Sequence, residues 1–519
     1  MPQNPIARTV TANDLYNLIK CPHRVYLDAH GNPAEKGEVG PFVTLLWERG
    51  LQTEREYVAS LSAEHLIEDL SDLAAGQAFP ETIRAMQAGA PVIYQGCLID
   101  GPFVGRPDLL VKHEEGTSSF GPYLYEPIDI KAGRGWEPGE GRTARFKAHY
   151  AVQIMFYRML LERIQGSLPP MARIVNVDNQ LETFDPSSFE DTFQRALSQA
   201  QRLVAGEECS EPVLGSQCFL CAWVQHCQRW VKDHDDPTGL FSIGRQKFRL
   251  KEVGLRTIHD IAQMDITTYL RPEKKIPRMS EKTLRRMKLR ANVVLSGEPL
   301  IRPGYTFPQT EREIYFDIED DPTRGVTYLF GLLIVEKHGP PRYTYFLARH
   351  PKEEEAAVRA FWAFLAEGRD ETYYVYSHKE RSTLKQLRDR YGLDPALFDR
   401  YVSREFDLYS KLIVEYSDWP TFSYSLKHIA KRIGFYWRDP DPSGAHSIAW
   451  YNTYLEDPAN EDALQRILLY NEDDCRAMRA VKLFFQHQAQ YDSDQGQALD
   501  RQGSLPFTGS DTVLCPTKR

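Results

Sequence analysis

Three strand-like runs follow one another closely in the C-terminal part of the chain, and they constrain its fold more than any other feature. Residues 314–318, 327–335 and 343–347 either alternate apolar and polar side chains or are continuously apolar. Such short runs predict neighbouring strands with one or both faces buried. A helical pattern at 352–366 and a further strand-like run at 373–376 follow them. Strands followed by alternating helices predict an α/β unit.

A second mixed α/β pattern occupies the N-terminal part of the chain. Residues 12–28 predict a helix, because apolar side chains recur at helical spacing and Thr11 and Asp14 fit a capping box. The pattern continues until a cysteine-rich stretch that ends near Trp230. The other predicted helices of this part cover residues 43–61 and 142–161, and its predicted strands cover residues 91–98, 103–111 and 123–130.

A basic segment lies between the two α/β parts. Residues 245–290 contain 14 Lys and Arg against 5 Asp and Glu, which gives a net charge of +9. The formal net charge of the whole chain is −9, so the remaining residues carry −18. Apolar residues recur there at helical spacing and are interrupted at Gly254. The pattern resembles a helix-hairpin-helix element, which contacts phosphates without reading sequence. A solvated helical linker would show the same pattern, so both interpretations stand.

Length and composition limit the class of protein. A chain of 519 residues with 42% hydrophobic and 26% charged residues can form two or three globular domains. The N-terminal sequence lacks the apolar region of a signal peptide, and the longest apolar run, residues 326–335, is too short to span a bilayer. We therefore expect a cytoplasmic protein without a membrane partner. The chain also lacks a G-x₄-GK[ST] motif, which excludes an ATP-driven motor that uses it.

Two acidic residues and a lysine lie on consecutive predicted strands of the N-terminal part. Asp108 follows Pro107 at the end of one strand, and Asp129 and Lys131 occur two residues apart near the end of the next. Residues two apart on a strand face the same side, so Asp129 and Lys131 project together. Converging carboxylates favour Mg²⁺ or Mn²⁺, and a lysine beside them can orient a metal-bound water. A surface strand with ordinary charges would show the same short pattern.

Two further features flank this pattern. Glu54 lies in a predicted helix upstream, and Gln153 and Tyr157 lie four residues apart on one face of the predicted helix downstream. The order G-x₃-E, PD, D-x-K and Q-x₃-Y resembles the RecB family of PD-(D/E)xK nucleases, which have a restriction-endonuclease-like α/β fold. In many relatives His stands where this chain has Glu54. The resemblance implies that Glu54, Asp108 and Asp129 bind metal and that Lys131 is catalytic. It also implies that Gln153 and Tyr157 position the DNA.

Three cysteines cluster after the first α/β part, in the pattern Cys218-x₂-Cys221-x₅-Cys227. Three clustered cysteines need a fourth ligand, and Cys21 in the first predicted helix is the candidate. One N-terminal cysteine with a C-terminal C-x₂-C-x₅-C resembles the RecB-like nucleases that carry a 4Fe–4S cluster, such as AddB subunits and CRISPR-associated RecB-like exonucleases. Four thiolates suit a cubane cluster or structural zinc. We expect Cys97, Cys209 and Cys475 to be buried small residues. Cys515 is expected to be either another such residue or an exposed thiol in the C-terminal tail.

A second acidic pattern lies in the C-terminal part. Asp317 and Glu319 occur two residues apart on the first predicted strand and therefore face one side. Tyr470 and Asp474 lie four residues apart on a late predicted helix and share a face. D-x-E on a strand with Y-x₃-D on a late helix resembles the outer motifs of DEDDy exonucleases, which have an RNase H-like fold. In that family four carboxylates hold two divalent metals, and the tyrosine orients the attacking water.

The middle acidic residue departs from the usual family pattern of an Asn and then an Asp. Glu380, which follows the predicted strand at 373–376, occupies the expected place, and Asp407 is the alternative. The segment resembles the predicted RNase H-like domains that are fused to RecB-type nucleases, and residues 425–439 share this resemblance. Basic side chains there line a substrate groove or form the outer face of an amphipathic helix: Lys427, Lys431 and Arg432.

The motifs together predict three parts and a tail. A RecB-like nuclease with a four-cysteine cluster occupies residues 1–235, a basic helical linker 236–305, an RNase H-like DEDDy exonuclease 306–486, and a disordered polar tail 487–519. The resemblance implies a Mg²⁺- or Mn²⁺-dependent deoxyribonuclease with a 4Fe–4S cluster and two active sites.

We expect this enzyme to hydrolyse DNA from single-stranded ends, in the 3′→5′ direction at the C-terminal site. A role in repair, recombination or defence follows only by analogy. An exonuclease that processes RNA is the first alternative, since DEDD enzymes act on either polymer. A largely non-catalytic nucleic-acid-binding partner of a helicase is the second.

Overall fold

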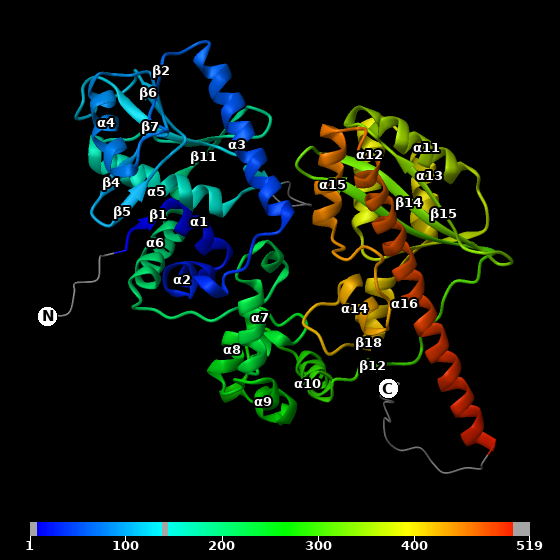
Figure 1. Ribbon diagram of the computed structural model, residues 1–519. Coiled ribbons are helices and arrows are strands. Elements are labelled where there is room, and N and C mark those ends of the chain that lie inside the picture. Colours follow the sequence, from blue (N-terminus) through cyan, green and yellow to red (C-terminus); the bar gives the residue numbers. More distant parts are fainter. Residues whose placement is uncertain (1–7, 138–143, 502–519) are drawn as a thin grey trace. The chain divides into compact units, whose positions relative to one another are not determined.

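The chain folds into two compact units, Met1–Arg229 and Trp230–Arg519 (Figure 1). The computed structural model describes the backbone of residues 8–137 and 144–501, and the side chains of these ranges up to residue 489. Each unit is mixed α/β with its own sheets and hydrophobic cores, as the sequence predicts. Within the described ranges, no helix has both the length and the apolar character needed to cross a membrane.

A six-stranded mixed sheet lies at the centre of the first unit, in the order β11-β10-β7-β6-β3-β2. Strand β7 pairs with β6 in antiparallel and with β10 in parallel orientation. The strands of this sheet are β2 (Ile67–Asp69), β3 (Val92–Tyr94), β6 (Leu109–His113), β7 (Leu124–Ile130), β10 (Ala172–Val175) and β11 (Leu181–Phe184). Smaller pairings join β1 (Val10–Thr11), β5 (Phe103–Gly105) and β4 (Leu98–Asp100), and β8 (Trp136–Glu137) with β9 (Arg145–Phe146).

Helices cover both faces of this sheet. The helices of the first unit are α1 (Ala12–Lys20), α2 (Pro22–His30), α3 (Pro41–Ser62), α4 (Ala75–Gln87), α5 (Ala148–Gln165) and α6 (Glu190–Ala205), and α7 (Val224–Asp233) contains the boundary between the units. Ile93, Leu110 and Tyr125 pack in the core that contains α5. Val92 and Ile128, on the other face, pack with side chains from the end of α3. Successive residues of β7 therefore face opposite layers, which directs Asp129 toward α5.

The structure corrects the bounds of four predicted elements in this unit. The predicted helix 12–28 begins with the expected Thr11–Asp14 capping box, but it divides at Cys21 because Pro22 has no N–H to continue it. The strand-like run 91–98 is interrupted at Gln95, whose φ is +53°. The run 103–111 also divides, at the Pro107–Asp108 step, so Asp108 precedes β6 instead of ending a strand. The predicted helix 142–161 starts at Ala148, and its first two residues lie outside the described ranges.

A five-stranded sheet organises the second unit, in the order β15-β14-β13-β16-β17. The three long strands pair in antiparallel orientation, and β16 and β17 continue the sheet parallel to β13. The predicted strands of this part are thereby confirmed. The strands are β13 (Arg312–Asp321), β14 (Val326–Glu336), β15 (Arg342–Leu347), β16 (Glu371–Val375) and β17 (Glu405–Asp407), and a separate pair joins β12 (Leu300–Ile301) to β18 (Ser417–Asp418).

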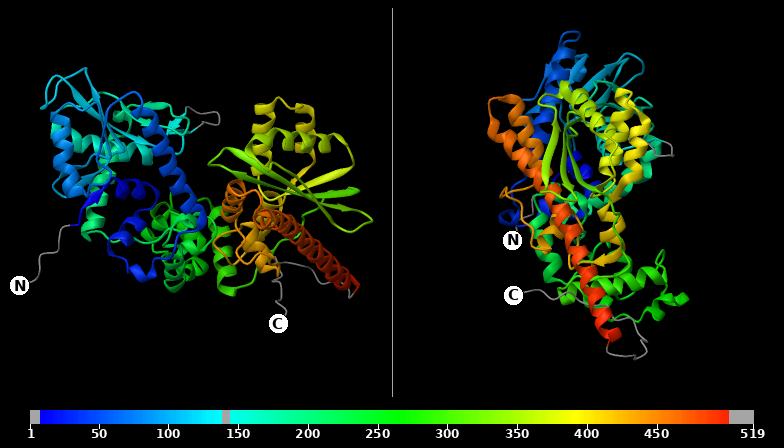
Figure 2. Two further views of the ribbon diagram at one scale, coloured as in Figure 1. Left: turned by 45° about the horizontal axis from the view of Figure 1, so that its top comes forward. Right: turned by 90° about the vertical axis from the view of Figure 1, so that its right-hand side faces the viewer.

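Two layers of helices cover this sheet, and Figure 2 shows α16 on one side and α11 to α13 on the other. Phe316 and Ile318 of β13 pack with α11, α12 and α13, while Tyr315 packs with the middle of α16. Side chains of β13 that alternate with Phe316 therefore face α16. These helices are α11 (Glu354–Ala366), α12 (Lys379–Tyr391), α13 (Pro395–Arg404), α14 (Leu426–Arg432), α15 (Gly444–Glu456) and α16 (Glu461–Arg501), with a π-helical turn, η8, at Tyr409–Val414.

The basic helical segment is part of the second unit. It comprises α8 (Gln246–Glu252), α9 (Ile258–Gln263) and α10 (Glu281–Ser296), which share a small core of their own. The ring of Phe241 stacks on Tyr424 at a centroid distance of 3.8 Å. Arg290 of α10 donates to the buried carboxylate of Asp418 at 2.8 Å. The segment predicted as a linker is therefore packed on the α/β sheet domain.

Helix α16 extends further than the sequence predicts. The ordered domain was expected to end near residue 486, but α16 continues to Arg501. Residues 488–501 are polar but contain no proline, and their Gln, Ala and Leu residues favour helix. Residues 502–519 of the predicted tail lie outside the described ranges, as does Cys515.

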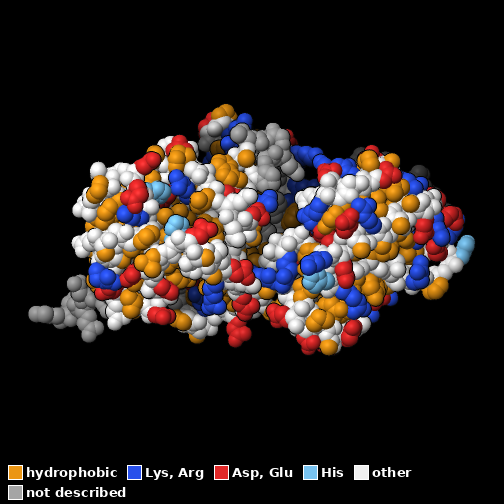
Figure 3. Space-filling view, turned by 90° about the horizontal axis from the view of Figure 1, so that it is seen from above, with side chains coloured by type: hydrophobic (Ala, Val, Ile, Leu, Met, Phe, Trp, Pro, Cys, Tyr) orange, Lys and Arg blue, Asp and Glu red, His pale blue; other side chains and the backbone are white. Residues whose placement is uncertain are grey.

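On the face that Figure 3 shows, basic and acidic side chains are intermingled over the described surface.

Candidate active sites

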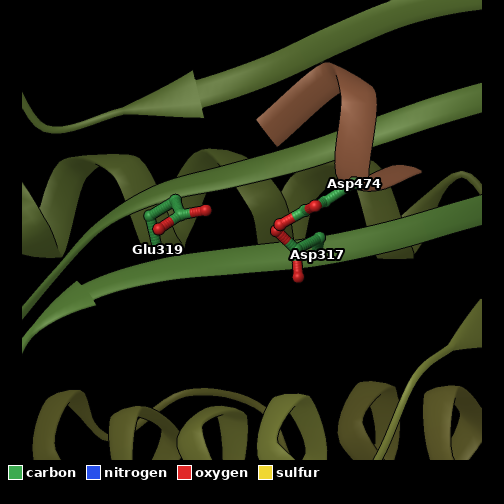
Figure 4. Close-up of side chains that lie close together, drawn as sticks. All are labelled: Asp317, Glu319 and Asp474. Atoms are coloured by element: carbon green, nitrogen blue, oxygen red, sulfur yellow. The ribbon is translucent and has the colours of Figure 1, made fainter. Parts of the chain in front are cut away.

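Three carboxylates of the second unit come together on the central strand of its sheet (Figure 4). Asp317 and Glu319 lie on β13, on the face toward α16, and Asp474 reaches the same place from that helix. One oxygen atom of each lies within 4.8 Å of the others. Among the described residues, this is the one group of three or more acidic, Cys or His side chains with such close ligand atoms.

Buried donors fix two of these carboxylates. Nδ2 of Asn471 donates to Oδ2 of Asp317 at 2.7 Å, and Nε1 of Trp437 donates to Oδ1 of Asp474 at 2.7 Å. Asn471 approaches closely because Gly331 has no side chain: a Cβ there would lie 1.6 Å from Oδ1 of Asn471. Hydrogen bonds to ionised groups are stronger than neutral ones, so these donors hold the carboxylates in place.

The three carboxylates repel one another in a buried place. Burial, and then the charges of Asp474 and Glu319, raise the pKa of Asp317 well above its usual range. Burial and Asp474 raise the pKa of Glu319 to about 8. Burial also raises the pKa of Asp474, although Lys427 acts in the opposite direction. A divalent cation among these oxygens would relieve the repulsion, and carboxylate oxygens are the ligands that Mg²⁺ and Mn²⁺ prefer.

The predicted tyrosine lies beside this trio. Tyr470 is buried on α16, and Nζ of Lys427 donates to its hydroxyl oxygen at 2.8 Å. Burial and then the charge of Asp474 raise the pKa of Tyr470 well above its usual range. The phenol therefore keeps its proton and can donate a hydrogen bond toward the carboxylates.

The middle acidic residue does not join the close trio. Glu380 is buried in the first turn of α12, and its charge contributes to the raised pKa of Asp317. Burial raises the pKa of Glu380 itself to about 7. The alternative, Asp407, instead accepts hydrogen bonds from the N–H of Tyr409 at 2.9 Å and the hydroxyl of Ser410 at 2.6 Å. Its carboxylate caps the turn that follows β17.

The motif residues of the first unit also converge. The backbone N–H of Asp108 donates to Oδ1 of Asp129 at 3.2 Å, and Nζ of Lys131 donates to Oδ2 of Asp129 at 2.7 Å. The same ammonium donates to Oε1 of Gln153 at 2.9 Å, and the amide of Gln153 donates to the hydroxyl of Tyr157 at 3.3 Å. The backbone N–H that precedes β6 and side chains from the end of β7 and from α5 thus form one hydrogen-bonded chain.

Glu54 joins this group through another residue. Its Oε1 accepts from the hydroxyl of Tyr94 at 2.9 Å and from Nε2 of Gln95 at 2.7 Å. The same Nε2 lies 3.1 Å from Oδ1 of Asp108. An amide therefore lies between the carboxylate of α3 and that of the strand, and these acidic residues do not form a trio as close as that of the second unit.

Electrostatics mark this group as one site. Burial and then the charge of Asp129 raise the pKa of Asp108 well above its usual range, and Glu54 adds to the effect. Burial alone would lower the pKa of Lys131, but Asp129 and Asp108 outweigh it and raise the pKa. The lysine is therefore a cation held among carboxylates.

The four predicted cluster cysteines line one cavity of about 210 Å³. Cys21 enters it from the junction of α1 and α2, and the other three enter from residues 218–227. Burial and then the nearby Cys221 raise the pKa of Cys227 to about 12. Among the described residues, no three of these thiols lie within 4.8 Å of one another. Of the other cysteines, Cys97 and Cys475 are buried as expected, but Cys209 is exposed.

The comparisons with known proteins address the second unit. A family model of the RNase_H superfamily matches residues 314–485, about a third of the chain. The acidic trio lies in an RNase H-like domain. This domain begins in β13 and ends within α16, so it contains all three carboxylates and Tyr470. The predicted RNase H-like core is thereby confirmed, and such a domain indicates a nuclease-type hydrolase. No curated protein matches the chain.

Sequence reasoning missed three residues that hold the carboxylates. Asn471 directly follows Tyr470, but the Y-x₃-D spacing gives no role to the intervening positions. Trp437 lies within residues 425–439, where only the basic side chains stood out. Gln95 lies inside a run that reads as one strand, and nothing in its sequence context marks the left-handed backbone that interrupts it.

Proposed function

We propose that the protein is a Mg²⁺- or Mn²⁺-dependent nuclease with two active sites, one in each unit. The approach of Asp317, Glu319 and Asp474 to within 4.8 Å, inside the RNase H-like domain, carries this proposal. Three carboxylates this close together, two of them buried, would be costly without a cation, and their oxygens are suitable ligands for hard divalent ions.

At the C-terminal site, Asp317, Glu319 and Asp474 would hold the metal, and Glu380 is the proposed fourth carboxylate. Bound divalent ions would activate a water molecule and stabilise the leaving oxygen of the phosphodiester. Tyr470 keeps its proton and orients the attacking water through its hydroxyl. Lys427 donates to the oxygen of this hydroxyl, so the hydroxyl proton can be donated to the water.

At the N-terminal site, we propose a RecB-like PD-(D/E)xK centre. Glu54, Asp108 and Asp129 supply oxygen ligands for a divalent ion, and Lys131 stabilises charge that develops on the scissile phosphate. Lys131 is already oriented by Asp129 and by Gln153. We propose that Gln153 and Tyr157 also contact the DNA, as the resemblance implies.

The four-cysteine cavity is proposed to hold a 4Fe–4S cluster. In a tetrahedral zinc site with Zn–S bonds of about 2.3 Å, the sulfur atoms lie about 3.8 Å apart. The thiols here are more widely spaced, around a cavity of about 210 Å³, which suits a multi-iron cluster better than a single ion. The cluster would connect the α1–α2 junction to residues 218–227.

The proposed substrate is DNA with single-stranded ends, which the C-terminal site would degrade in the 3′→5′ direction. The basic helices α8 to α10 are packed on the RNase H-like domain through Phe241 and Arg290, and their lysines and arginines would contact phosphates. A role in repair, recombination or defence, with a helicase as a possible partner, would accommodate two nuclease sites. RNA is the alternative substrate.

The test is a polarity-resolved nuclease assay with each site disabled in turn. Matched single-stranded DNA and RNA oligonucleotides, labelled at the 3′ or 5′ end, are incubated with Mn²⁺ and with the Asp317→Asn or Asp129→Asn protein. Loss of a metal ligand removes several kcal/mol of transition-state stabilisation, so we expect each variant to lose about a hundredfold or more at its own site. The double variant should be inactive on both polymers.

Matched controls exclude a general effect of charge removal. Asp399→Asn changes an exposed carboxylate of α13, and Asp191→Asn changes one of α6. Both should cleave at the wild-type rate. A double site variant that degrades oligonucleotides as fast as the wild type contradicts the proposed function. Binding of oligonucleotides with Mn²⁺ but without any shortening would instead favour the non-catalytic alternative.

A further inference from the structure

Gln95 adopts a backbone conformation that residues with a side chain rarely adopt. Its φ is +53°, in the left-handed region, and it lies between β3 and β4 in a well-formed part of the first unit. Glycine takes this conformation without strain, whereas a Cβ makes it unfavourable. Strained residues of this kind persist where the surroundings fix them, and they concentrate at functional sites.

The backbone of Gln95 is held on both sides. Its N–H donates to the carbonyl oxygen of Asp108 at 2.9 Å, and its own carbonyl accepts from Nε of Arg106 at 2.9 Å. Arg106 in turn donates to the carbonyl oxygens of Leu70 and Leu73 at 2.6 and 3.0 Å. The left-handed turn is therefore fixed to the segment that carries Asp108.

The side chain of Gln95 connects two carboxylates from different elements. Its Nε2 lies 2.7 Å from Oε1 of Glu54, on α3, and 3.1 Å from Oδ1 of Asp108, before β6. An amide nitrogen has two hydrogens, so it can donate one to each carboxylate. A neutral donor with a partial positive charge thus lies where two negative groups approach each other. Glycine at this position would permit the same turn but would leave the two carboxylates unconnected.

We propose that Gln95 is a positioning residue that fixes Glu54 relative to Asp108 and so completes the divalent-metal site of the first unit. The inference rests on the proposed function of that site. The helix α3 carries Glu54 but contributes few buried side chains, with Val43 its one buried residue. Its carboxylate therefore needs a local connection to stay with the strand carboxylates. Tyr94 also donates to Glu54, but the amide of Gln95 reaches Asp108 as well and so connects the two carboxylates.

The experiment measures metal affinity and stability separately, in the full chain. An Asp317→Asn, Asp474→Asn background disables the C-terminal site, and Mn²⁺ binding is followed by calorimetry. Changes in residues that orient metal ligands commonly reduce affinity by about 10- to 100-fold. We expect a loss of this size for Gln95→Gly, together with unchanged or higher thermal stability without metal, because glycine relieves the backbone strain.

Two further variants distinguish this role from others. Gln95→Asn tolerates the left-handed backbone but is one methylene shorter, so it should bind Mn²⁺ more weakly than the parent. Gln77→Ala, on the exposed surface of α4, should bind Mn²⁺ like the parent. If Gln95→Gly lowers stability but binds Mn²⁺ as tightly as the parent, Gln95 is merely structural and the inference fails.

The failure of the underlying site has a different signature. Asp129→Asn in the same background should abolish the remaining Mn²⁺ binding. If the background protein binds no Mn²⁺, or binds it equally well after Asp129→Asn, the proposed metal site itself is wrong. If Asp129→Asn abolishes binding while Gln95→Gly preserves it, the site stands and only the role of Gln95 is refuted.

Discussion

Nζ of Lys427 lies 2.8 Å from the hydroxyl oxygen of Tyr470 and 4.7 Å from the centre of its ring. The lysine comes from the short helix α14 and the tyrosine from α16, so the contact joins two elements at the acidic trio. A cation that donates to the phenol oxygen leaves the phenol proton available for another acceptor. Lys427 thereby orients the group that would position the attacking water.

Replacement of Lys427 should lower the activity of the C-terminal site. Lys427→Met keeps much of the aliphatic side chain but removes the donor. A hydrogen bond that involves a charged group contributes about 1.5–3 kcal/mol, so we expect a roughly 10- to 100-fold lower rate of 3′-end degradation. Lys385→Met, on the exposed surface of α12, is the control and should leave the rate unchanged. Equal rates for the two variants would refute this role.

A methyl group at Gly331 should also disable this site. In Gly331→Ala the new Cβ would lie 1.6 Å from Oδ1 of Asn471, so Asn471 must move and its bond to Asp317 must break. We expect weaker Mn²⁺ binding and a rate at least about tenfold lower. Gly339→Ala has no close neighbour other than Cβ of Glu336 at 3.8 Å and serves as the control. Wild-type Mn²⁺ affinity in Gly331→Ala would count against the orienting role of Asn471.

The carboxylates of both sites were predictable from the sequence, because strand and helix periodicity place residues two or four apart on one face. D-x-E, Y-x₃-D, D-x-K and Q-x₃-Y each follow this rule, and the structure brings the residues of each motif together. The residues that orient them were not predictable. Gln95, Trp437 and Asn471 act across pairings between distant segments, which no local spacing encodes.

The limits of the predicted fold have the same origin. Pro22 divides a helix whose apolar spacing is continuous, and Gln95 interrupts a run that reads as one strand. The basic helices read as a linker, because the sequence does not show that Arg290 reaches Asp418. Such features depend on which segments pack together. Glu380 illustrates the same point, since it occupies the expected place in the sequence but does not join the close trio.

The stability of the metal-free protein should depend on pH through Glu319. Burial and Asp474 raise its pKa in the folded protein to about 8, from an ordinary value of 4.5. The raised pKa stabilises the fold below pH 4.5, and this contribution is lost as the pH rises through 8. A cation binds the deprotonated form, so the rise in melting temperature caused by Mg²⁺ should be larger at about pH 8.5 than at pH 6.

Thermal melts with Mg²⁺ or EDTA at the two pH values measure this effect. In Glu319→Gln this side chain stays neutral at both pH values, so the pH dependence of the Mg²⁺ effect should become smaller, while Asp317 and Asp474 still contribute to it. An equal or larger Mg²⁺ effect at pH 6 in the wild-type protein would contradict the raised pKa of the trio.

The four-cysteine cavity should hold iron and sulfide when the protein is purified without oxygen. We expect a brown protein, whose colour and iron content are lost in Cys227→Ser. The melting temperature of Cys227→Ser should also be lower, since the α1–α2 junction loses its connection to residues 218–227. Cys209→Ser, which changes an exposed thiol, should keep the iron. A colourless protein with stoichiometric zinc would contradict the proposed cluster.

Asp418 should be the main electrostatic connection between the basic helices and the RNase H-like domain. Its buried carboxylate accepts from Arg290 at 2.8 Å and from Arg302 at 2.5 Å, and Arg286 lies 3.4 Å away. Asp418→Ala removes the one carboxylate that all three arginines contact, and leaves them only backbone carbonyl acceptors. We expect a loss of roughly 2–4 kcal/mol in urea unfolding, near the low end for buried pairs because the arginines are partly exposed.

The control for this prediction lies on the same helix. Glu281 pairs with Arg285 on the exposed surface of α10, so Glu281→Ala should cost less than about 0.5 kcal/mol. If both variants unfold at the same urea concentration, the Asp418 contacts contribute little to the packing of the basic helices.

The most direct test of the account is anomalous diffraction from crystals of the full chain soaked in Mn²⁺. The account predicts a strong peak among the oxygens of Asp317, Glu319 and Asp474, and a second peak beside Asp108 and Asp129. Both peaks should disappear after the corresponding Asp→Asn substitutions. Crystals that diffract well at saturating Mn²⁺ and show no peak at the acidic trio would contradict the central claim.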